Sequence, residues 1–263
     1  MLYYKQYYMS KPKKNIKSKS KPKKEEDEMI NFYEKSEVQV FCPEYHNPNY
    51  NRETMPLKHP MRAVIVGASG SGKSNVLLNL IQKLDNTFNS IKIFTQDKHE
   101  PLYEYLESKI EKPFLEIFEG IDAFNNFDMS EMEDGQHMII FDDFCIESER
   151  KQSKVKELYI RGRKMCKSGL SLVYITQSYY DCPIIIRKQA GTFIMKKING
   201  GRELRAILKD CSLNATGSQL ENMYDYCVAS ADDIQNFLLI DKVAPESARF
   251  RKNLRQILNP NDF

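Results

Sequence analysis

The sequence predicts an α/β fold with a mostly parallel central sheet flanked by helices, over residues 58–258. Two observations carry this prediction. Short apolar runs recur along the chain, and most of them are followed by a segment whose apolar residues have helical spacing. Strands that are apolar on both faces are typical of a parallel sheet covered on both sides. A chain of 263 residues is long enough to bury such a core.

Six apolar runs predict the strands. The clearest of them are continuous apolar runs, AVIV at 63–66 and MIIF at 138–141. In chain order the expected strands lie at 63–66, 91–95, 114–118, 137–141, 170–176 and 192–196.

Five segments predict helices, because their apolar residues recur three or four positions apart. They lie at 76–84, 101–111, 154–167, 201–210 and 217–228. The third is expected from a row of side chains on one face: Val155, Leu158, Tyr159, Met165 and Cys166. Strands and helices therefore alternate along the chain, which favours one α/β domain.

The two ends differ from this domain in composition. Residues 1–28 form a Lys-rich tail that we expect to be disordered, because it has almost nothing apolar to bury. It is equally well explained as a nuclear-localisation or DNA-contacting tail and as a solubilising arm. Residues 29–57 are rich in proline towards their end and predict an extended strap, a connector that leads into the domain. Residues 259–263 predict a C-terminal tail.

Charge and cysteine content exclude several function classes. Residues 1–24 carry nine lysines and no acid, so residues 25–263 keep 30 basic against 36 acidic residues, a net charge of −6. This excludes a basic globular surface. The six cysteines form no C-x-x-C pair, which indicates reduced thiols in a cytosolic compartment and neither a zinc site nor a disulfide framework. The longest apolar runs are too short for a membrane span or a secretory signal, so we expect no membrane partner.

A glycine-rich loop between the first strand and the first helix predicts a phosphate site. GASGSGKS at 67–74 satisfies G-x-x-x-x-G-K-[ST], the P-loop motif, in its required context. Such a loop cradles phosphates with backbone N–H groups and a helix N-terminus, while Lys73 reaches the β- and γ-phosphates and the Ser74 hydroxyl ligates Mg²⁺. The cofactors expected are ATP and Mg²⁺. The residues expected to bind the nucleotide are Gly67, Ala68, Ser69, Gly70, Ser71, Gly72, Lys73, Ser74 and Asn75.

Two acids follow the strand at 137–141. Asp142 is expected to hold Mg²⁺ largely through its water shell, and Asp143 to orient or deprotonate the attacking water. The alternative is a helix cap or a solvated charge at a strand end. Glu147 and Glu149 are further candidates for the base.

The strand at 170–176 ends in Thr-Gln. Gln177 can sense the γ-phosphate or position water, and a strand-end glutamine bonded to a loop is an equally good explanation. Arg161, Arg163 and Arg187 flank this strand. A guanidinium can stabilise transition-state charge across a subunit boundary, although each arginine taken alone is better explained as a surface charge.

Three segments together resemble the genome-packaging ATPases of large eukaryotic DNA viruses and virophages, in the FtsK–HerA superfamily. They are MRAVIVGASGSGKSNVLLNLI, HMIIFDDF and RGRKMCKSGLSLVYITQSYYDCPIIIRKQAGTFI. A late FLLIDK strand and the segment RFRKNLRQIL also look like the end of that family's domain.

The resemblance implies an additional-strand, RecA-like P-loop ATPase domain over 58–258. It implies a homo-oligomeric ring, hexameric in form, that hydrolyses ATP to move double-stranded DNA into a preformed capsid, with a capsid or portal protein as partner. The resemblance implies that Gln177 senses the γ-phosphate. It also implies an arginine that acts on the nucleotide site of a neighbouring subunit, with Arg163 as the first candidate and Arg187 and Arg161 after it. The implied location is the virion or the host cytoplasm, or the nucleus if the Lys-rich tail is a targeting signal.

Two other functions compete with this one. A P-loop kinase of a small acceptor would use the basic segment 144–169 as a lid. A nucleotide-dependent DNA or capsid adaptor would bind ATP with negligible hydrolysis. The paired acids after the strand at 137–141 favour water attack, and therefore hydrolysis, over both.

Overall fold

The computed structural model describes residues 30–198, 200–211, 213–228 and 234–263. The chain divides into two compact units, Met1–Cys42 and Pro43–Phe263. The described part of the first unit has a 3-10 turn, η1 (Phe32–Glu34), and a short helix, α1 (Ser36–Gln39). The predicted disordered tail at 1–28 lies outside the described residues.

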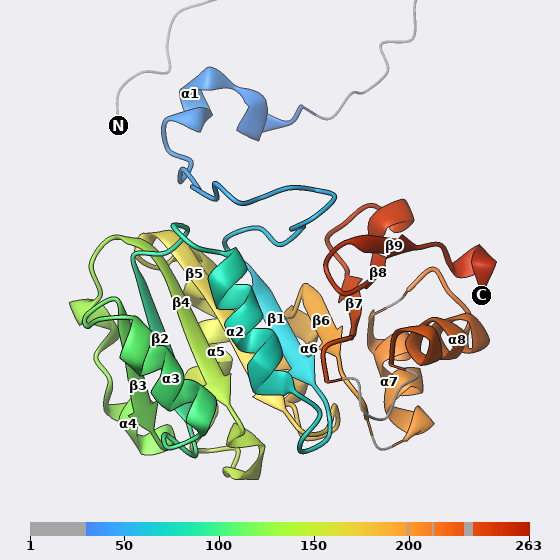
Figure 1. Ribbon diagram of the computed structural model, residues 1–263. Helices are drawn as coiled ribbons and strands as arrows, with labels where there is room; N and C mark the ends of the chain where they lie inside the picture. Colours follow the sequence, from blue (N-terminus) through green and yellow to red (C-terminus); the bar gives the residue numbers. More distant parts are fainter. Residues whose placement is uncertain (1–29, 199, 212, 229–233) are drawn as a thin grey trace, which may run out of the picture. The chain divides into compact units, whose positions relative to one another are not determined.

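The second unit is built on one mixed sheet, whose nine described strands have the order β3-β2-β4-β5-β1-β6-β7-β8-β9 (Figure 1). In this order the first six strands are parallel, and the last three continue the sheet from β6 in antiparallel fashion. The strands are β1 (Arg62–Val66), β2 (Ser90–Thr95), β3 (Leu115–Glu119), β4 (Gly135–Asp142), β5 (Lys167–Thr176), β6 (Thr192–Met195), β7 (Leu238–Asp241), β8 (Phe250–Lys252) and β9 (Gln256–Leu258). The predicted mostly parallel α/β fold is confirmed.

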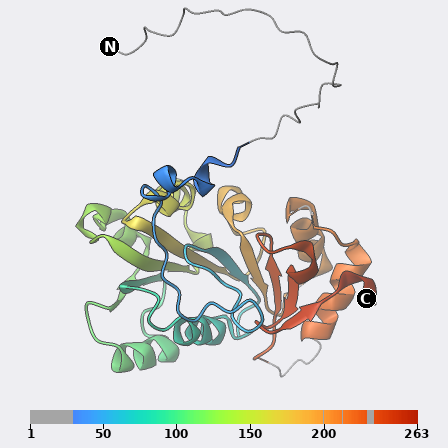
Figure 2. The same ribbon diagram turned by 90° about the horizontal axis from the view of Figure 1, so that it is seen from above.

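The helices form two layers, one on each face of the sheet (Figures 1 and 2). They are α2 (Lys73–Lys83), α3 (Pro101–Lys109), α4 (Ile121–Asn126), α5 (Ser153–Arg161), α6 (Ile184–Gln189), α7 (Gly201–Cys211) and α8 (Gly217–Val228). Along β1 the side chains alternate between the layers. Ala63 and Ile65 pack with α2 and α3, whereas Val64 and Val66 pack with α4 to α8. None of the described helices is both long and apolar enough to cross a membrane.

Strand β5 lies between β4 and β1, so an additional strand separates the strand of the glycine-rich loop from the strand of the paired acids. Thr176 at the end of β5 pairs with Val66, and Ile175 pairs with Asp142. The carboxyl ends of these three parallel strands therefore meet at one edge of the sheet, which is where the predicted site residues follow.

The helix predicted at 154–167 ends early. Helix α5 stops at Arg161, a 3-10 turn follows at Gly162–Lys164, and β5 begins at Lys167. Cys166 and Lys167 have positive φ angles of 50° and 53°, and Gly169 has 75°. A Cβ on Gly169 would lie 2.7 Å from the Arg163 carbonyl oxygen, so a tight turn requires this glycine. The helical spacing of Met165 and Cys166 gave no sign of this turn.

Four short elements were not predicted. Helices α4 and α6 have six residues each, and the hairpin of β8 and β9 has three residues in each strand. Apolar periodicity needs a longer window than these elements provide. Helix α2 also begins three residues before the predicted helix, because Gly72 ends the glycine-rich loop directly at its N-terminus.

The compact unit extends beyond the predicted boundaries of 58–258 at both ends. Part of the predicted strap, residues 43–57, packs into it, with Met55 and Leu57 buried. The Arg251 guanidinium donates to the Arg52 carbonyl at 2.7 Å, which ties this segment to β8. At the other end, the Phe263 carbonyl accepts a hydrogen bond from Asn222 Nδ2 at 3.1 Å. Side-chain contacts distant in sequence decide both boundaries.

Buried His59 makes the stability of the fold depend on pH. Its Nε2–H donates to the Ser168 carbonyl and its Nδ1 accepts from the Ser171 hydroxyl, both at 2.8 Å. Burial lowers the pKa of His59, so the native imidazole stays neutral while the unfolded one takes up a proton below about pH 6.5. Native stability from this residue is therefore present above that pH and lost as the pH falls.

We expect the stability difference between wild type and His59→Gln to be smaller at pH 5.5 than at pH 7.5. Urea unfolding at both pH values measures it. His99→Gln is the matched control, because it makes the same substitution at a histidine whose side chain is 77% exposed rather than buried. An equal difference at both pH values for His59→Gln would contradict the prediction.

Candidate nucleotide site

The glycine-rich loop at 67–74 connects β1 to α2 and is held at both neighbouring strand ends. The Gly67 amide donates to the Thr176 carbonyl of β5 at 3.2 Å, and the Ala68 amide donates to the Lys197 carbonyl beyond β6 at 2.7 Å. The Ser71 amide donates back to the Ala68 carbonyl at 3.1 Å. These bonds give the loop a defined curvature before any ligand binds.

Two glycines of the loop have left-handed backbone angles. Gly70 has a φ of 72°, and apart from its two chain neighbours no described residue has an atom within 4 Å of where its Cβ would be, so the space beside it is open. Gly72 has a φ of 86° and precedes α2, and a Cβ there would lie 2.6 Å from the Ile234 carbonyl oxygen. The loop therefore needs glycine at both positions, and it leads directly into a helix N-terminus, which favours anions.

Two side chains of the loop fit a phosphate ligand. Lys73 Nζ donates only to the Ala68 carbonyl at 3.2 Å among the described residues, so an ammonium donor remains for a bound anion. Burial lowers the pKa of Lys73, against the nearby charges of Asp142 and Asp143. The Ser71 hydroxyl oxygen is buried and makes no hydrogen bond with the described residues. An oxygen-rich anion would satisfy such a donor.

Asp142 ends β4 and is buried, with 8% of its surface exposed. Tyr103 of α3 donates its hydroxyl to Asp142 Oδ2 at 2.6 Å. Burial raises the pKa of Asp142 to about 6, while the hydrogen bond from Tyr103 and the charge of Lys73 oppose this rise. Tyr103 was not among the predicted site residues, because a tyrosine on the buried face of a helix carries no signal that separates it from the core.

Asp143 and Gln177 are in contact. Gln177 Nε2 donates to Asp143 Oδ2 at 2.8 Å, and the other oxygen, Oδ1, accepts only the weak thiol hydrogen bond of Cys145 at 3.4 Å among the described residues. Asp143 has a left-handed φ of 60°, which turns the chain away from β4 immediately after Asp142. Two residues predicted separately therefore form one pair, because β4 and β5 are neighbours.

The other acids of this edge have different surroundings. Glu147 accepts from Gln96 Nε2 at 3.0 Å, and the side chain of Glu149 is 97% exposed. The charge of Glu100, immediately before α3, adds to the rise in the pKa of Asp142 and opposes the lowering of the pKa of Lys73 by burial. Glu100 was not among the predicted site residues, because its place near the loop depends on the packing of α3.

The three candidate arginines make their described contacts away from the loop at 67–74. Arg187 packs over the Tyr179 ring, with 4.7 Å from its guanidinium carbon to the ring centre, and pairs with Asp210 at 3.3 Å. Arg161 pairs with Glu157 at 2.8 Å. Arg163 is exposed, and no ion pair in the described part of the chain involves it.

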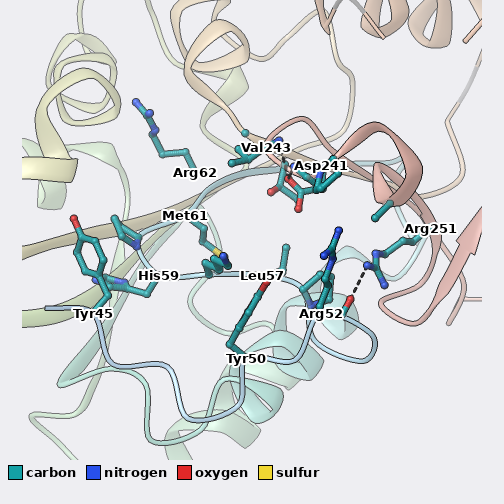
Figure 3. A pocket seen from close by; sticks show the side chains of 18 of the residues that line it. Tyr45, Tyr50, Arg52, Leu57, His59, Met61, Arg62, Asp241, Val243 and Arg251 are labelled. Atoms are coloured by element: carbon teal, nitrogen blue, oxygen red, sulfur yellow. Dashed lines mark hydrogen bonds between the residues drawn. The ribbon is translucent and has the colours of Figure 1, made fainter. Parts of the chain in front are cut away.

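Arg163 belongs to the opposite edge of the sheet. It lines a cavity of about 390 Å³ at the amino end of β1, together with Arg62. Figure 3 shows this cavity between Tyr50 and Arg52 on one side and Asp241 on the other. Because the glycine-rich loop follows the carboxyl end of β1, Arg163 cannot reach the loop of its own chain across the sheet.

Asn75 lies on the first turn of α2, one residue after Ser74. It lines a second cavity of about 450 Å³ beside α2, with residues of α2 on one wall and the region of β7 and β8 on the other. The other lining residues include Asn79, Lys83, Phe237, Asn253 and Arg255. Among the residues predicted to bind the nucleotide, Asn75 is therefore the one that lines this cavity.

Residues 47–250 match the family described as Poxvirus A32 protein. The chain belongs to the poxvirus A32 protein family. This match spans the loop, both acids and Gln177, and it confirms the family-level resemblance stated from the motifs. No curated protein matches the chain significantly in sequence.

Solved structures similar to this A32-family chain include the genome packaging NTPase B204 from Sulfolobus turreted icosahedral virus 2. Its complex with sulfate has a TM-score of 0.52 and 20% identity, and the match covers 80% of this chain and 99% of B204. Its complex with AMP has a TM-score of 0.51 and 19% identity, with 79% and 100% covered. The likeness shows a common P-loop NTPase fold.

Proposed function

We propose that this A32-family protein is a genome-packaging ATPase, a motor that hydrolyses ATP to move double-stranded DNA into a capsid. One observation carries the proposal. A phosphate-binding loop, a buried carboxylate and the Asp143–Gln177 pair follow three adjacent parallel strands at one edge of the sheet. B204, which shares the fold, is by name a packaging NTPase.

ATP would place its phosphates on the loop at 67–74, and Mg²⁺ would be held by Ser74 and Asp142. A hydroxyl and a carboxylate, completed by phosphate oxygens and water, suit a small hard cation that keeps several waters. The ion would neutralise charge on the transferred phosphoryl group. Lys73 would add its charge between the β- and γ-phosphates, and the buried Ser71 hydroxyl would gain a partner, which it lacks among the described residues.

Asp143 would act as the general base. Its Oδ2 is held by Gln177, which orients the carboxylate, while Oδ1 accepts only a weak thiol hydrogen bond among the described residues and can take a proton from water. Gln177 in this arrangement is both a positioning group for Asp143 and a sensor, because a γ-phosphate within its reach would compete for the same amide donor. This pair favours hydrolysis over phosphoryl transfer to a small acceptor.

Arg163 would complete the site of a neighbouring copy. An arginine at the amino edge of one subunit can reach a phosphate loop at the carboxyl edge of the next when a head-to-tail interface closes into a ring. Arg163 and Arg161 are both exposed, but Arg161 forms an ion pair with Glu157 and Arg187 forms one with Asp210, whereas no ion pair in the described part of the chain involves Arg163. A hexameric ring, a capsid or portal partner, and a place in the virion or host cytoplasm all belong to this proposal.

Steady-state ATP hydrolysis with and without long double-stranded DNA tests the function. We expect DNA to stimulate turnover without regard to base sequence and with a strong loss at high salt, because backbone phosphates dominate such contacts. Single-stranded DNA of equal mass is the matched control. Nucleotide binding with a turnover that no DNA changes would support the adaptor function instead.

A further inference from the structure

Tyr103 brings a hydroxyl into the nucleotide site from an element with no sequence motif. It lies in α3 and is fully buried, with 0% of its surface exposed. Its ring is part of the apolar cluster between the sheet and helices α2 and α3, which also holds such side chains as Leu77 and Ile140. Its hydroxyl donates to Asp142 Oδ2 at 2.6 Å. The ring is thus held by packing, and the hydroxyl points at the strand-end carboxylate.

We propose that Tyr103 is a positioning residue, which holds the Asp142 carboxylate in the orientation that binds the magnesium ion of the nucleotide complex. The inference rests on the proposed function, since it assumes that Asp142 serves a metal–nucleotide complex. Nothing in the phosphate-loop motif or in the paired acids requires a tyrosine at this place.

The hydrogen bond leaves Asp142 little freedom. A carboxylate at the end of a strand can rotate about its side-chain torsions, and either oxygen can face a ligand. The bond from Tyr103 occupies Oδ2 and leaves Oδ1 for the metal or its water. A short bond from a neutral hydroxyl to a carboxylate is among the stronger hydrogen bonds in proteins, and burial from water strengthens it further.

The position of α3 makes this support rigid. Helix α3 follows β2, and β2 pairs with β4 so that Thr95 lies beside Asp142. The helix also packs beside α2, the helix that begins with Lys73 and Ser74 (Figure 1). The element that supplies Tyr103 is therefore fixed against both the strand that carries Asp142 and the helix that carries the other metal-binding candidate.

Tyr103→Phe removes only the hydroxyl and tests the proposal in the full-length protein. Tyr159→Phe is the matched control, because Tyr159 is equally buried and its hydroxyl donates to the Ala63 carbonyl at 3.2 Å, in the helical layer on the other face of the sheet. Both variants lose one buried hydroxyl hydrogen bond. Only the first loses a contact to Asp142.

Equilibrium binding of a fluorescent ATP analogue, titrated with Mg²⁺ or held in EDTA, gives the readout. For Tyr103→Phe we expect unchanged affinity in EDTA and a Mg²⁺ concentration for half-maximal effect raised by roughly 10-fold or more, since loss of a group that orients a metal ligand typically weakens metal affinity by about 10- to 100-fold. The turnover number should fall as well. Tyr159→Phe should match wild type in both titrations.

The outcomes separate this inference from the proposed function. A wild-type protein that binds Mg²⁺–nucleotide without hydrolysing it would overturn the motor, while the Mg²⁺ titration would still decide on Tyr103. Equal Mg²⁺ dependence in Tyr103→Phe and wild type would overturn the positioning role, even if the variant were less stable. Wild-type nucleotide binding that does not depend on Mg²⁺ would also overturn the positioning role of Tyr103.

Discussion

Asp143→Asn should lower the turnover number of ATP hydrolysis by about 10²- to 10⁴-fold while leaving ATP binding intact, because a general base typically contributes a factor of this size. The substitution is nearly isosteric. The side-chain oxygen of the introduced asparagine can still accept the hydrogen bond that Gln177 donates to Asp143 Oδ2, so the loop after β4 keeps its geometry. What the variant loses is the negative charge and the capacity to take up a proton from water.

Lys73→Ala is the comparison that separates chemistry from binding. Lys73 would contact the phosphates directly, so its loss should weaken ATP binding as well as hydrolysis. Turnover is measured at saturating ATP, and binding by titration of a fluorescent ATP analogue. A turnover number of Asp143→Asn close to that of wild type would show that Asp143 is not the general base. Glu147→Gln and Glu100→Gln would then be the variants to compare, because both acids lie near this edge of the sheet.

Arg163→Ala should lower turnover by about 10³-fold or more, the contribution expected of an arginine that stabilises phosphoryl-transfer charge from a neighbouring subunit. ATP binding by the variant should change less than turnover, because Arg163 lies far from its own phosphate loop and its proposed contact in the neighbouring subunit stabilises charge that develops in the transition state. Arg205→Ala is a matched control, since Arg205 is also an exposed arginine, with 72% of its side chain exposed and an ion pair to Glu221.

A mixing experiment tests whether Arg163 acts between subunits. Arg163→Ala subunits keep an intact Asp143, and Asp143→Asn subunits keep an intact Arg163. In a mixed ring, an Asp143→Asn subunit can supply its arginine to the site of an Arg163→Ala neighbour, so two inactive variants should regain part of the wild-type turnover. If Arg163→Ala hydrolyses ATP at the wild-type rate, Arg163 is not the trans-acting arginine. If mixing restores nothing, it does not act across the interface.

Most of the fold was predictable because its strands and longer helices carry strong local patterns. The run at 63–66 became β1, and the segment at 217–228 became α8 with the predicted bounds. The phosphate loop was predictable for a related reason. Its chemistry requires glycines, a lysine and a serine at fixed spacing between a strand and a helix, so the local sequence contains the whole motif.

The pairing of distant residues depended on strand order. The sequence placed Asp143 and Gln177 each at the end of an apolar run, but the pairing of β4 with β5 is what brings Gln177 Nε2 to 2.8 Å from Asp143 Oδ2. The surroundings of Arg187 also depend on packing. The family resemblance made Arg187 a candidate trans-acting arginine after Arg163, and the tertiary structure places its guanidinium over the Tyr179 ring and against Asp210.

The sequence by itself determined the α/β class, the phosphate loop and the two strand-end acids, because each is encoded in short stretches of consecutive residues. Only the tertiary structure decided the Tyr103–Asp142 contact, the limits of the domain and the edge on which Arg163 lies. These features join residues tens of positions apart, and a single sequence records the identity of such residues but not which of them the packing of the chain brings together.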